Sequence, residues 1–299
     1  MIASTVDKLN AGRVILSKVG AYFELIKFRL SFLVAFSSGF GYILSSRSHV
    51  DWSMFVFFCI GAILMSGSAV TINQILEKDY DKLMKRTKNR PLPTEKISIG
   101  EAWIFSIILL VISSFILIVF TNQLTFALSV VSFILYAFVY TPLKRVGPIA
   151  VFVGAIPGAL PPLLGWVAFT GTISYEALII FGIQFIWQFP HFWAIAWIAD
   201  EDYKRAGFKL LPGEGKKDFK TAVNIMIYTL FLLPFGLLPA KFGLTGMNSA
   251  IIATVCGVLF LAQTFKLMRD NSRKSAMRIM FGSFLYLPII QIAYLMDKV

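Results

Sequence analysis

The sequence predicts an all-α membrane protein that crosses the bilayer many times, and three observations predict it. Of the 299 residues, 57% are apolar and 15% are charged, whereas soluble domains carry about 25% charged residues. The mean hydropathy is +0.75, and the apolar residues form long uninterrupted blocks. The strands of a membrane barrel would show short alternating segments instead. The composition therefore excludes a soluble enzyme, a disordered protein and a secreted disulfide scaffold.

Nine blocks are long enough to form spanning helices, which need about 20 mainly apolar residues. Leu, Ile, Phe, Ala and Gly dominate these blocks, so we expect helices in all of them. The predicted spans are 25–45, 53–75, 101–120, 123–140, 148–169, 176–198, 221–240, 247–267 and 277–296.

The positions of Lys and Arg predict the orientation of these spans, because basic residues concentrate in cytoplasmic segments. Of the 28 basic residues, 25 lie in the N-terminal segment or after the even-numbered spans, and three lie in the opposite segments. We therefore predict a cytoplasmic N-terminus and an outer C-terminus. We also expect residues 1–299 to form one intramembrane domain with a cytoplasmic segment at 1–24, which lacks a signal-peptide core. The net charge of +12 fits this topology, and no nucleic-acid partner is predicted.

Two large predicted cytoplasmic loops, about 76–100 and 199–220, resemble each other. Each contains an acid–Tyr pair, a basic run and a Leu-Pro step. The loops lie four helices apart and in the same orientation, which predicts two pseudo-repeated four-helix halves. Internal repeats of membrane transporters place the site between such halves.

The first loop opens with three oxygen-bearing side chains at helical spacing. Asn73, Glu77 and Asp81 are four residues apart, so a helix places them on one face. Carboxylates grouped in this way suit Mg²⁺, which adds water and phosphate oxygens to its protein ligands. Arg86 and Arg90 follow and could clamp the phosphate. The alternative is an ordinary solvated helix at the membrane interface.

The second loop repeats this arrangement of acids followed by bases. Asp200, Glu201 and Asp202 are consecutive and cannot share one helical face, because successive residues diverge by about 100°. We expect one or two of them to face the site and the rest to face water. Lys204 and Arg205 come directly after them. Two such clusters predict a two-sided site for a metal-bridged phosphate.

Three further side chains are candidates for chemistry near the membrane. His191 is the only histidine within a predicted span, and ionisable groups inside a membrane are costly enough to suggest function. It could ligate a metal, act as a base or hydrogen-bond between helices. Tyr140 and Lys144 close the fourth span, where the lysine either contacts phosphate or snorkels to the interface.

Glycine and proline interrupt the fifth span, 148–169, at six positions. A membrane helix tolerates such breaks where protein or a cavity satisfies the freed backbone groups. The span is therefore predicted to be either a kinked packing helix or a cavity wall.

The chain resembles the UbiA superfamily of intramembrane prenyltransferases in its first acidic motif, which reads Asn73-x3-Glu77-x3-Asp81-x4-Arg86-Thr87-x2-Arg90-Pro-Leu. Two departures stand out: Glu77 occupies the usual middle Asp position, and a second Asp-x3-Asp motif is absent. Other segments resemble the haem O synthase family of that superfamily, which departs likewise. They are Tyr140-Thr-x-x-Lys144-Arg145, Gly158-Ala-x-Pro161-Pro162-Leu-x-Gly165-Trp166, Trp187-Gln-x-Pro-His191-Phe-Trp and Asp202-Tyr-x-x-Ala-Gly207-x-x-Leu-Leu-Pro212.

This resemblance implies nine helices around a central cavity and the transfer of a farnesyl group from farnesyl diphosphate to haem b. It implies Mg²⁺ as the cofactor. It also makes haem A synthase and the assembly of the terminal oxidase candidate partners. The implied metal ligands are Glu77, Asp81, Asp200 and Asp202. The implied diphosphate-binding residues are Arg86, Arg90, Tyr140, Lys144, Lys204 and Arg205, with His191 and Trp187 on the haem side.

Two other functions stay open at this point. A secondary transporter also shows repeats and broken helices, but its coupling residues would be scattered at membrane depth, whereas the acids here gather at one surface. The other alternative is a prenyltransferase that acts on a quinone precursor.

Overall fold

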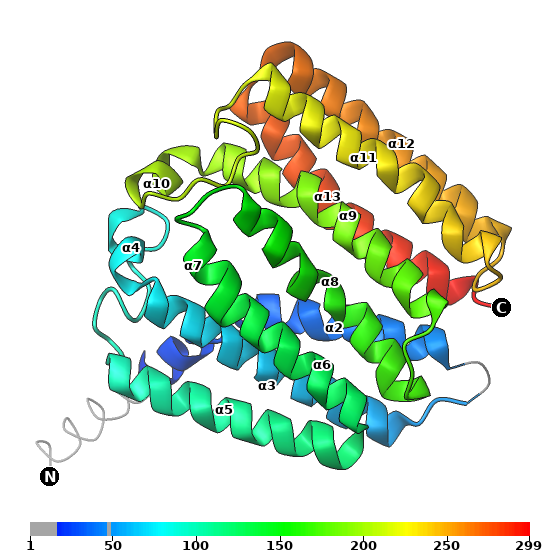
Figure 1. The fold of residues 1–299 in the computed structure, drawn as a ribbon, viewed down its shortest axis with the longest axis horizontal. Helices are drawn as coiled ribbons and strands as arrows, with labels where there is room; N and C mark the ends of the chain where they lie inside the picture. Colours follow the sequence, from blue (N-terminus) through cyan, green and yellow to red (C-terminus); the bar gives the residue numbers. More distant parts are fainter. Residues whose placement is uncertain (1–16, 47–48) are drawn as a thin grey trace, which may run out of the picture.

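The computed structural model describes residues 17–46 and 49–299, so the predictions for residues 1–16 and for Arg47 lie outside the described residues. The part of the chain that it describes contains nine helices long and apolar enough to cross a membrane, which confirms the all-α prediction. The helices pack side by side in one bundle (Figure 1). The long helices are α2 (Phe28–Ser45), α3 (Trp52–Leu76), α5 (Ile99–Phe120), α6 (Gln123–Ile134) with its continuation, α8 (Ile149–Thr170), α9 (Tyr175–Ile198), α11 (Phe219–Lys241), α12 (Met247–Asp270) and α13 (Arg273–Met296).

The helix boundaries follow the predicted spans, with two informative differences. The first span begins at Phe28 because the chain turns at Lys27, whose φ of 42° is left-handed. The last span begins at Arg273 because the Ser272 side chain caps the helix by accepting the N–H of Ser275 at 3.1 Å. Polar caps of this kind satisfy the free N–H groups of a first turn.

The fourth span changes its winding before it ends. After α6 it continues as the π-helix η1 (Leu135–Tyr140) and the single turn α7 (Thr141–Leu143), which contains Pro142. Pro142 has no N–H for the regular helical pattern, and the Thr141 hydroxyl donates to the Tyr136 carbonyl at 2.9 Å. π-Helical turns such as η1 are frequent at functional sites.

The proline-rich fifth span is α8, an unbroken helix at the centre of the bundle. Pro162 cannot donate to the Gly158 carbonyl four residues earlier, and Gln184 of α9 donates its amide N–H to that carbonyl at 2.8 Å. The freed backbone group is thus satisfied from a neighbouring helix. Residues of α8 also line the cavity described below, so of the two alternatives the cavity wall is correct. They are Gly154, Pro157, Gly158, Pro161 and Leu164.

Two short helices, α4 (Lys78–Leu83) and α10 (Asp200–Arg205), follow α3 and α9. They lie at the same end of the bundle, and the C-terminus lies at the opposite end (Figure 1). The two motif loops therefore share one end of the molecule, as predicted. The orientation of that end in the membrane and the four-helix repeat stay predictions.

Candidate active site

The first acidic cluster lies where α3 passes into α4. The Glu77 N–H donates to the Asn73 carbonyl at 3.0 Å, and the Asp81 N–H donates to the Glu77 carbonyl at 2.8 Å, so helical spacing continues across the junction. The side chains of Asn73, Glu77 and Asp81 therefore share one face. All three are buried, which rules out a solvated interfacial helix.

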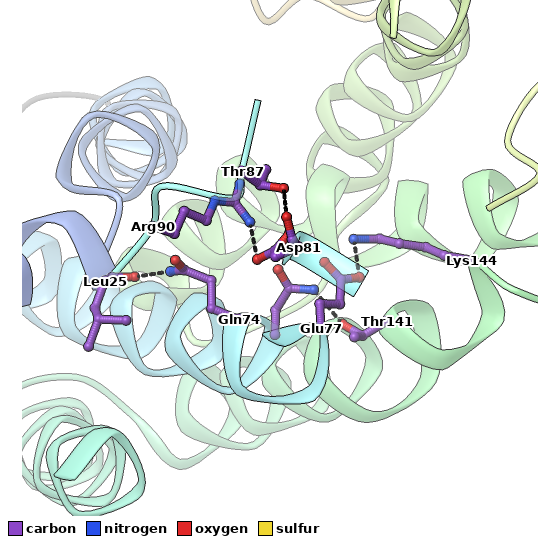
Figure 2. A network of polar contacts seen from close by, with 9 residues as sticks. Leu25, Gln74, Glu77, Asp81, Thr87, Arg90, Thr141 and Lys144 are labelled. Atoms are coloured by element: carbon purple, nitrogen blue, oxygen red, sulfur yellow. Dashed lines mark hydrogen bonds and ion pairs between the residues drawn. The ribbon is translucent and has the colours of Figure 1, made fainter. Parts of the chain in front are cut away.

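Each carboxylate of this cluster is paired with a base. Lys144 Nζ donates to Glu77 at 2.7 Å, and Arg90 donates to Asp81 at 2.7 Å (Figure 2). Lys144 also lies over the ring of Tyr140, with Nζ 4.6 Å from the ring centroid. Burial alone would lower the pKa of Lys144, but Glu77 and the neighbouring tyrosines outweigh it and raise the pKa, so Lys144 stays charged. Lys144 therefore turns into the protein and does not snorkel to the surface.

Neutral hydrogen bonds hold the acidic helix against its neighbours. The Asn73 amide donates to the Thr141 hydroxyl at 3.0 Å, which joins α3 to α7. The Gln74 amide donates to the Leu25 carbonyl, and the Thr87 hydroxyl donates to the Asp81 carbonyl at 2.9 Å (Figure 2). The acids are thus fixed by elements from three parts of the chain.

One carboxylate oxygen in the cluster is suited to a cation. Asp81 Oδ1 is buried and has no hydrogen-bond partner, and a buried acceptor without a donor is costly. Burial raises the pKa of Asp81, although Arg90 opposes that shift. A divalent ion would satisfy Oδ1, so the donor set fits Mg²⁺. Among residues 17–46 and 49–299, however, no three acidic, His or Cys side chains form a metal cluster by themselves.

Lys27 also belongs to the charged cluster, although in the sequence it is only one of the basic residues that predict the orientation. It stands just before α2, where its left-handed backbone turns the chain. Burial, together with the positive charges of Arg90 and Lys144, lowers the pKa of Lys27 to about 7 against the opposing effect of the acids. A lysine at the very start of an apolar span was the only available sequence signal.

The second acidic cluster lies on α10, and its three acids diverge as predicted. Asp200 is buried and pairs with Lys204 at 2.9 Å and with Lys217 at 3.3 Å. Asp202 is partly buried and pairs with Arg205 at 3.4 Å, whereas Glu201 is exposed. Lys204 and Arg205 are thus occupied within their own short helix.

Asp202 joins the two motif loops through the backbone. Its two carboxylate oxygens accept the N–H groups of Lys85 at 3.1 Å and Arg86 at 3.3 Å. The Arg86 side chain itself is exposed, so it lies outside the buried cluster that contains Arg90. Aromatic packing of Tyr80 on Phe208, with ring centroids 5.7 Å apart, adds a second contact between the loops. The metal role predicted for Asp200 and Asp202 stays a prediction.

A cavity of about 330 Å³ lies within the bundle and begins beside the first cluster. Tyr140 connects the cluster to the cavity, because it lines the cavity and Lys144 Nζ lies over its ring. The walls are mostly apolar, with a few hydroxyl and amide groups among them. The lining includes Leu33, Phe58, Met65, Leu117, Phe133, Tyr136, Leu164, Gln184, Gln188 and Leu287.

Trp187 and His191 lie together in the cavity wall on α9. Their rings stack with centroids 4.5 Å apart and planes 19° apart. His191 Nδ1 lies 2.8 Å from the hydroxyl of Ser283 on α13, and Trp187 Nε1 donates to the Ser283 carbonyl at 3.0 Å. Among the alternatives for His191, the hydrogen bond between helices is therefore present. The second ring nitrogen has no hydrogen-bond partner within the described residues.

Comparison with known proteins agrees with this arrangement. Residues 33–287 match the UbiA prenyltransferase family. A protoheme IX farnesyltransferase of Cytophaga hutchinsonii is 54% identical over 283 residues, covering 95% of this chain and 99% of the relative. Another from Flavobacterium psychrophilum is 43% identical, covering 92% of this chain and 93% of the relative. The mitochondrial protoheme IX farnesyltransferase of Arabidopsis thaliana is 36% identical, covering 93% of this chain and 65% of the relative.

Solved structures share the fold at low sequence identity. A digeranylgeranylglyceryl phosphate synthase superposes with a TM-score of 0.78 and 21% identity, covering 94% of this chain and 98% of that chain. A UbiA homolog from Archaeoglobus fulgidus, bound to GPP and Mg²⁺, superposes with a TM-score of 0.62 and 20% identity, covering 92% and 99%. The chain is therefore a multi-pass membrane protein of the UbiA prenyltransferase family, in which the three relatives named above are protoheme IX farnesyltransferases.

Proposed function

We propose that this protein transfers the farnesyl group of farnesyl diphosphate to a vinyl group of haem b and so forms haem O. One observation carries the proposal: Tyr140 joins a buried cluster of acids and bases to an apolar cavity whose wall also holds His191 and Trp187. A diphosphate needs the first feature, and a farnesyl chain needs the second. The similarity to protoheme IX farnesyltransferases supports haem b as the acceptor.

The proposed diphosphate site is the cluster around the end of α3. Asn73, Glu77 and Asp81 would supply oxygen ligands to Mg²⁺, with Asp200 and Asp202 contributing from the second loop. The relevant ion is Mg²⁺ because an Archaeoglobus UbiA homolog binds it together with GPP. When bound, Mg²⁺ neutralises charge on the diphosphate oxygens.

The basic residues of the cluster would bind the leaving diphosphate directly. Glu77 and Asp81 hold Lys144 and Arg90 in place, and these two bases would donate hydrogen bonds to the phosphate oxygens of a bound diphosphate. Lys27 interacts electrostatically with the same acids and bases. Arg86, Lys204 and Arg205 stand at the exposed rim, where they would attract the anion. Preorganised positive charge at the leaving group is the main aid to breaking the allylic C–O bond.

The farnesyl chain would occupy the apolar cavity. Burying its fifteen carbons is worth on the order of 10 kcal/mol at about 0.8 kcal/mol per methylene unit, so the chain favours walls such as Phe58 and Phe133. Aromatic faces, including that of Tyr140, also stabilise the allylic cation. Such walls exclude water while the cation forms.

The acceptor step conserves every atom. The electron pair of the broken C–O bond leaves with the diphosphate, and the haem vinyl group supplies the pair for the new C–C bond. The cation left beside the porphyrin ring takes up water and releases one proton, which gives a hydroxyethylfarnesyl substituent. His191 and Trp187 would hold the porphyrin, through the iron and through stacking respectively.

The proposed setting is the bacterial inner membrane, with the active site at its cytoplasmic side. The end of the bundle that carries α4 and α10 is also the end with most of the basic residues, which supports this orientation. Residues 1–299 would act as one domain. Its product would pass to haem A synthase or to the assembly of the terminal oxidase, either of which could contact it.

The test is a reconstitution of the purified protein in lipid nanodiscs with Mg²⁺, farnesyl diphosphate and haem b. Mass spectrometry should show haem O, and omission of Mg²⁺ should stop its formation. Parallel reactions with a hydroxybenzoate acceptor test the quinone-precursor alternative. Farnesylated hydroxybenzoate without haem O would contradict the proposal, as would recovery of both substrates unchanged.

A further inference from the structure

The ring of His191 forms a hydrogen bond with a buried serine on a neighbouring helix. Ser283 of α13 is fully buried, and its hydroxyl oxygen lies 2.8 Å from His191 Nδ1. The same hydroxyl lies 2.6 Å from the carbonyl oxygen of Met280 on its own helix. These two contacts decide which nitrogen of the ring carries the proton.

A hydroxyl has one proton to donate, and a carbonyl oxygen can only accept. The Ser283 proton therefore goes to Met280, and Ser283 must accept the second hydrogen bond from His191. Nδ1 is then the protonated nitrogen of the neutral ring. Nε2 consequently carries a free lone pair.

The surroundings of the ring prevent Nε2 from turning away. Trp187 stacks on one face at 4.5 Å, and Phe284 meets the ring edge-on at 5.1 Å. The Trp187 N–H is itself bound to the Ser283 carbonyl, so one residue of α13 positions both rings. His191, Trp187 and Phe284 all line the cavity, whereas Ser283 lies behind them. Nε2 is the ring nitrogen left for a ligand in the cavity.

We infer that Ser283 is a positioning residue that fixes His191 in its Nδ1–H tautomer, so that Nε2 serves as the axial ligand of the haem iron. This inference rests on the proposed function, because haem b is the proposed acceptor. A histidine that ligates a metal commonly donates its other N–H to a fixed acceptor, and loss of that acceptor lowers metal affinity about 10-fold or more. Ser283 supplies that acceptor here.

The experiment measures haem binding and the spectrum of the bound haem in full-length protein in nanodiscs. Ser283→Ala should weaken haem b binding about 10-fold and change the ligand-field bands and electron paramagnetic resonance of the ferric form. Ser283→Thr keeps the hydroxyl, so its haem b affinity and its ferric spectra should match those of the wild-type protein. Farnesyl diphosphate binding should be unchanged in each variant. Ser113→Ala is the matched control, because Ser113 is equally buried and donates between helices, to the Gly61 carbonyl at 2.7 Å.

His191→Ala separates this inference from the proposed function. It should abolish the histidine signature, and added imidazole should restore that signature. A wild-type spectrum in Ser283→Ala, together with loss of the signature in His191→Ala, would overturn the role of Ser283 alone. An unchanged spectrum in His191→Ala would overturn His191 as ligand and Ser283 with it. Failure of the wild-type protein to form haem O would instead contradict the proposed function.

Discussion

At the residue scale, the candidate site consists of charges that neutralise one another. Glu77 faces Lys144, and Asp81 faces Arg90, each at 2.7 Å and largely buried. Ion pairs of this kind bring little net stability, because desolvation offsets the attraction, but the loss of one partner is costly. In the proposed reaction, a metal diphosphate would take over both sets of partners: the acids would hold the metal and the bases would bind the phosphate oxygens.

Asp81 is the residue in which this exchange can be tested most directly. Asp81→Asn should lower haem farnesylation by at least ~100-fold, the usual cost of losing a group that organises transition-state charge. Mass-spectrometric assay of haem O checks this result. Asp79→Asn is the matched control, because Asp79 lies on the same short helix with its side chain 88% exposed. Similar activity in both variants would remove Asp81 from the proposed metal site.

Lys27 predicts a pH effect on diphosphate binding. Its pKa of about 7 means that it is largely neutral at pH 8 in the free protein. A bound diphosphate favours the charged form and raises this pKa, so binding should take up close to one proton at pH 8 and weaken as pH rises above 7.

Isothermal titration calorimetry of farnesyl diphosphate in buffers of different ionisation enthalpy measures the protons taken up. Lys27→Met should abolish most of the uptake at pH 8. The same number of protons in both proteins would show that another group is responsible.

At the scale of the elements, α8 is placed by glycines that allow backbones to touch. A Cβ at Gly41 of α2 would lie 1.8 Å from the Pro162 carbonyl oxygen, and one at Gly165 would lie 1.8 Å from that of Ser38. Helices in membranes often pack through small residues in this way. The close contact of α2 with α8 holds the proline-rich wall of the cavity in place.

Gly41→Ala should therefore destabilise the protein, because the clash is with backbone and cannot be relieved by a rotamer change. We expect a loss of about 1–3 kcal/mol, typical of overpacking. Thermal unfolding in detergent, followed by size-exclusion chromatography, measures the effect. Gly100→Ala in α5 has no heavy atom within 4 Å of the new Cβ and should not lower the Tm. Equal Tm values for both variants would contradict this packing argument.

The contact between the motif loops is a second property of the elements. Asp202→Ala removes the acceptor for the N–H groups of Lys85 and Arg86. We expect faster hydrogen exchange over residues 84–90 and a several-fold higher KM for farnesyl diphosphate, with the bundle intact. Glu201→Ala removes an exposed neighbour and serves as the control. Unchanged hydrogen exchange would contradict this role as a bridge between the loops, and a weakened response to Mg²⁺ would separately support the proposed metal role of Asp202.

At the scale of the whole molecule, most acidic and basic residues gather at one end of an apolar bundle. This end carries α4 and α10, and the opposite end carries the C-terminus (Figure 1). A diphosphate made in the cytoplasm would reach such an end from water, while its chain enters the apolar interior. The arrangement therefore suits a water-soluble head and a lipid-like tail.

The predicted orientation can be tested with single cysteines in a chain that lacks Cys59 and Cys256. Glu214→Cys, between α10 and α11, should react with an impermeant maleimide in inverted vesicles but not in spheroplasts. Thr172→Cys, between α8 and α9, should show the opposite pattern. Labelling of both from the same side would contradict the nine-span topology, and exchanged patterns would contradict the cytoplasmic assignment.

Much of the site was predictable wherever one helix sets the spacing. Asn73, Glu77 and Asp81 share a face because four residues make about one helical turn, and this holds even across the α3–α4 junction. The divergence of Asp200, Glu201 and Asp202 follows from the same geometry. Partners from distant helices could not be predicted in this way: Lys27 entered the cluster only because a left-handed turn directs the chain there.

The sequence by itself determined the class of the protein, its nine spans and the shared helical face of its acidic motif. Those features depend on local quantities: the length of apolar blocks, the helical period and the types of side chain in each loop. The tertiary structure alone decided that Lys144 faces Glu77, that Arg86 stays outside the cluster, that α8 lines a cavity and that Ser283 stands behind His191. These contacts join residues that lie tens of positions apart or more, and only the packing of helices brings them within hydrogen-bond distance.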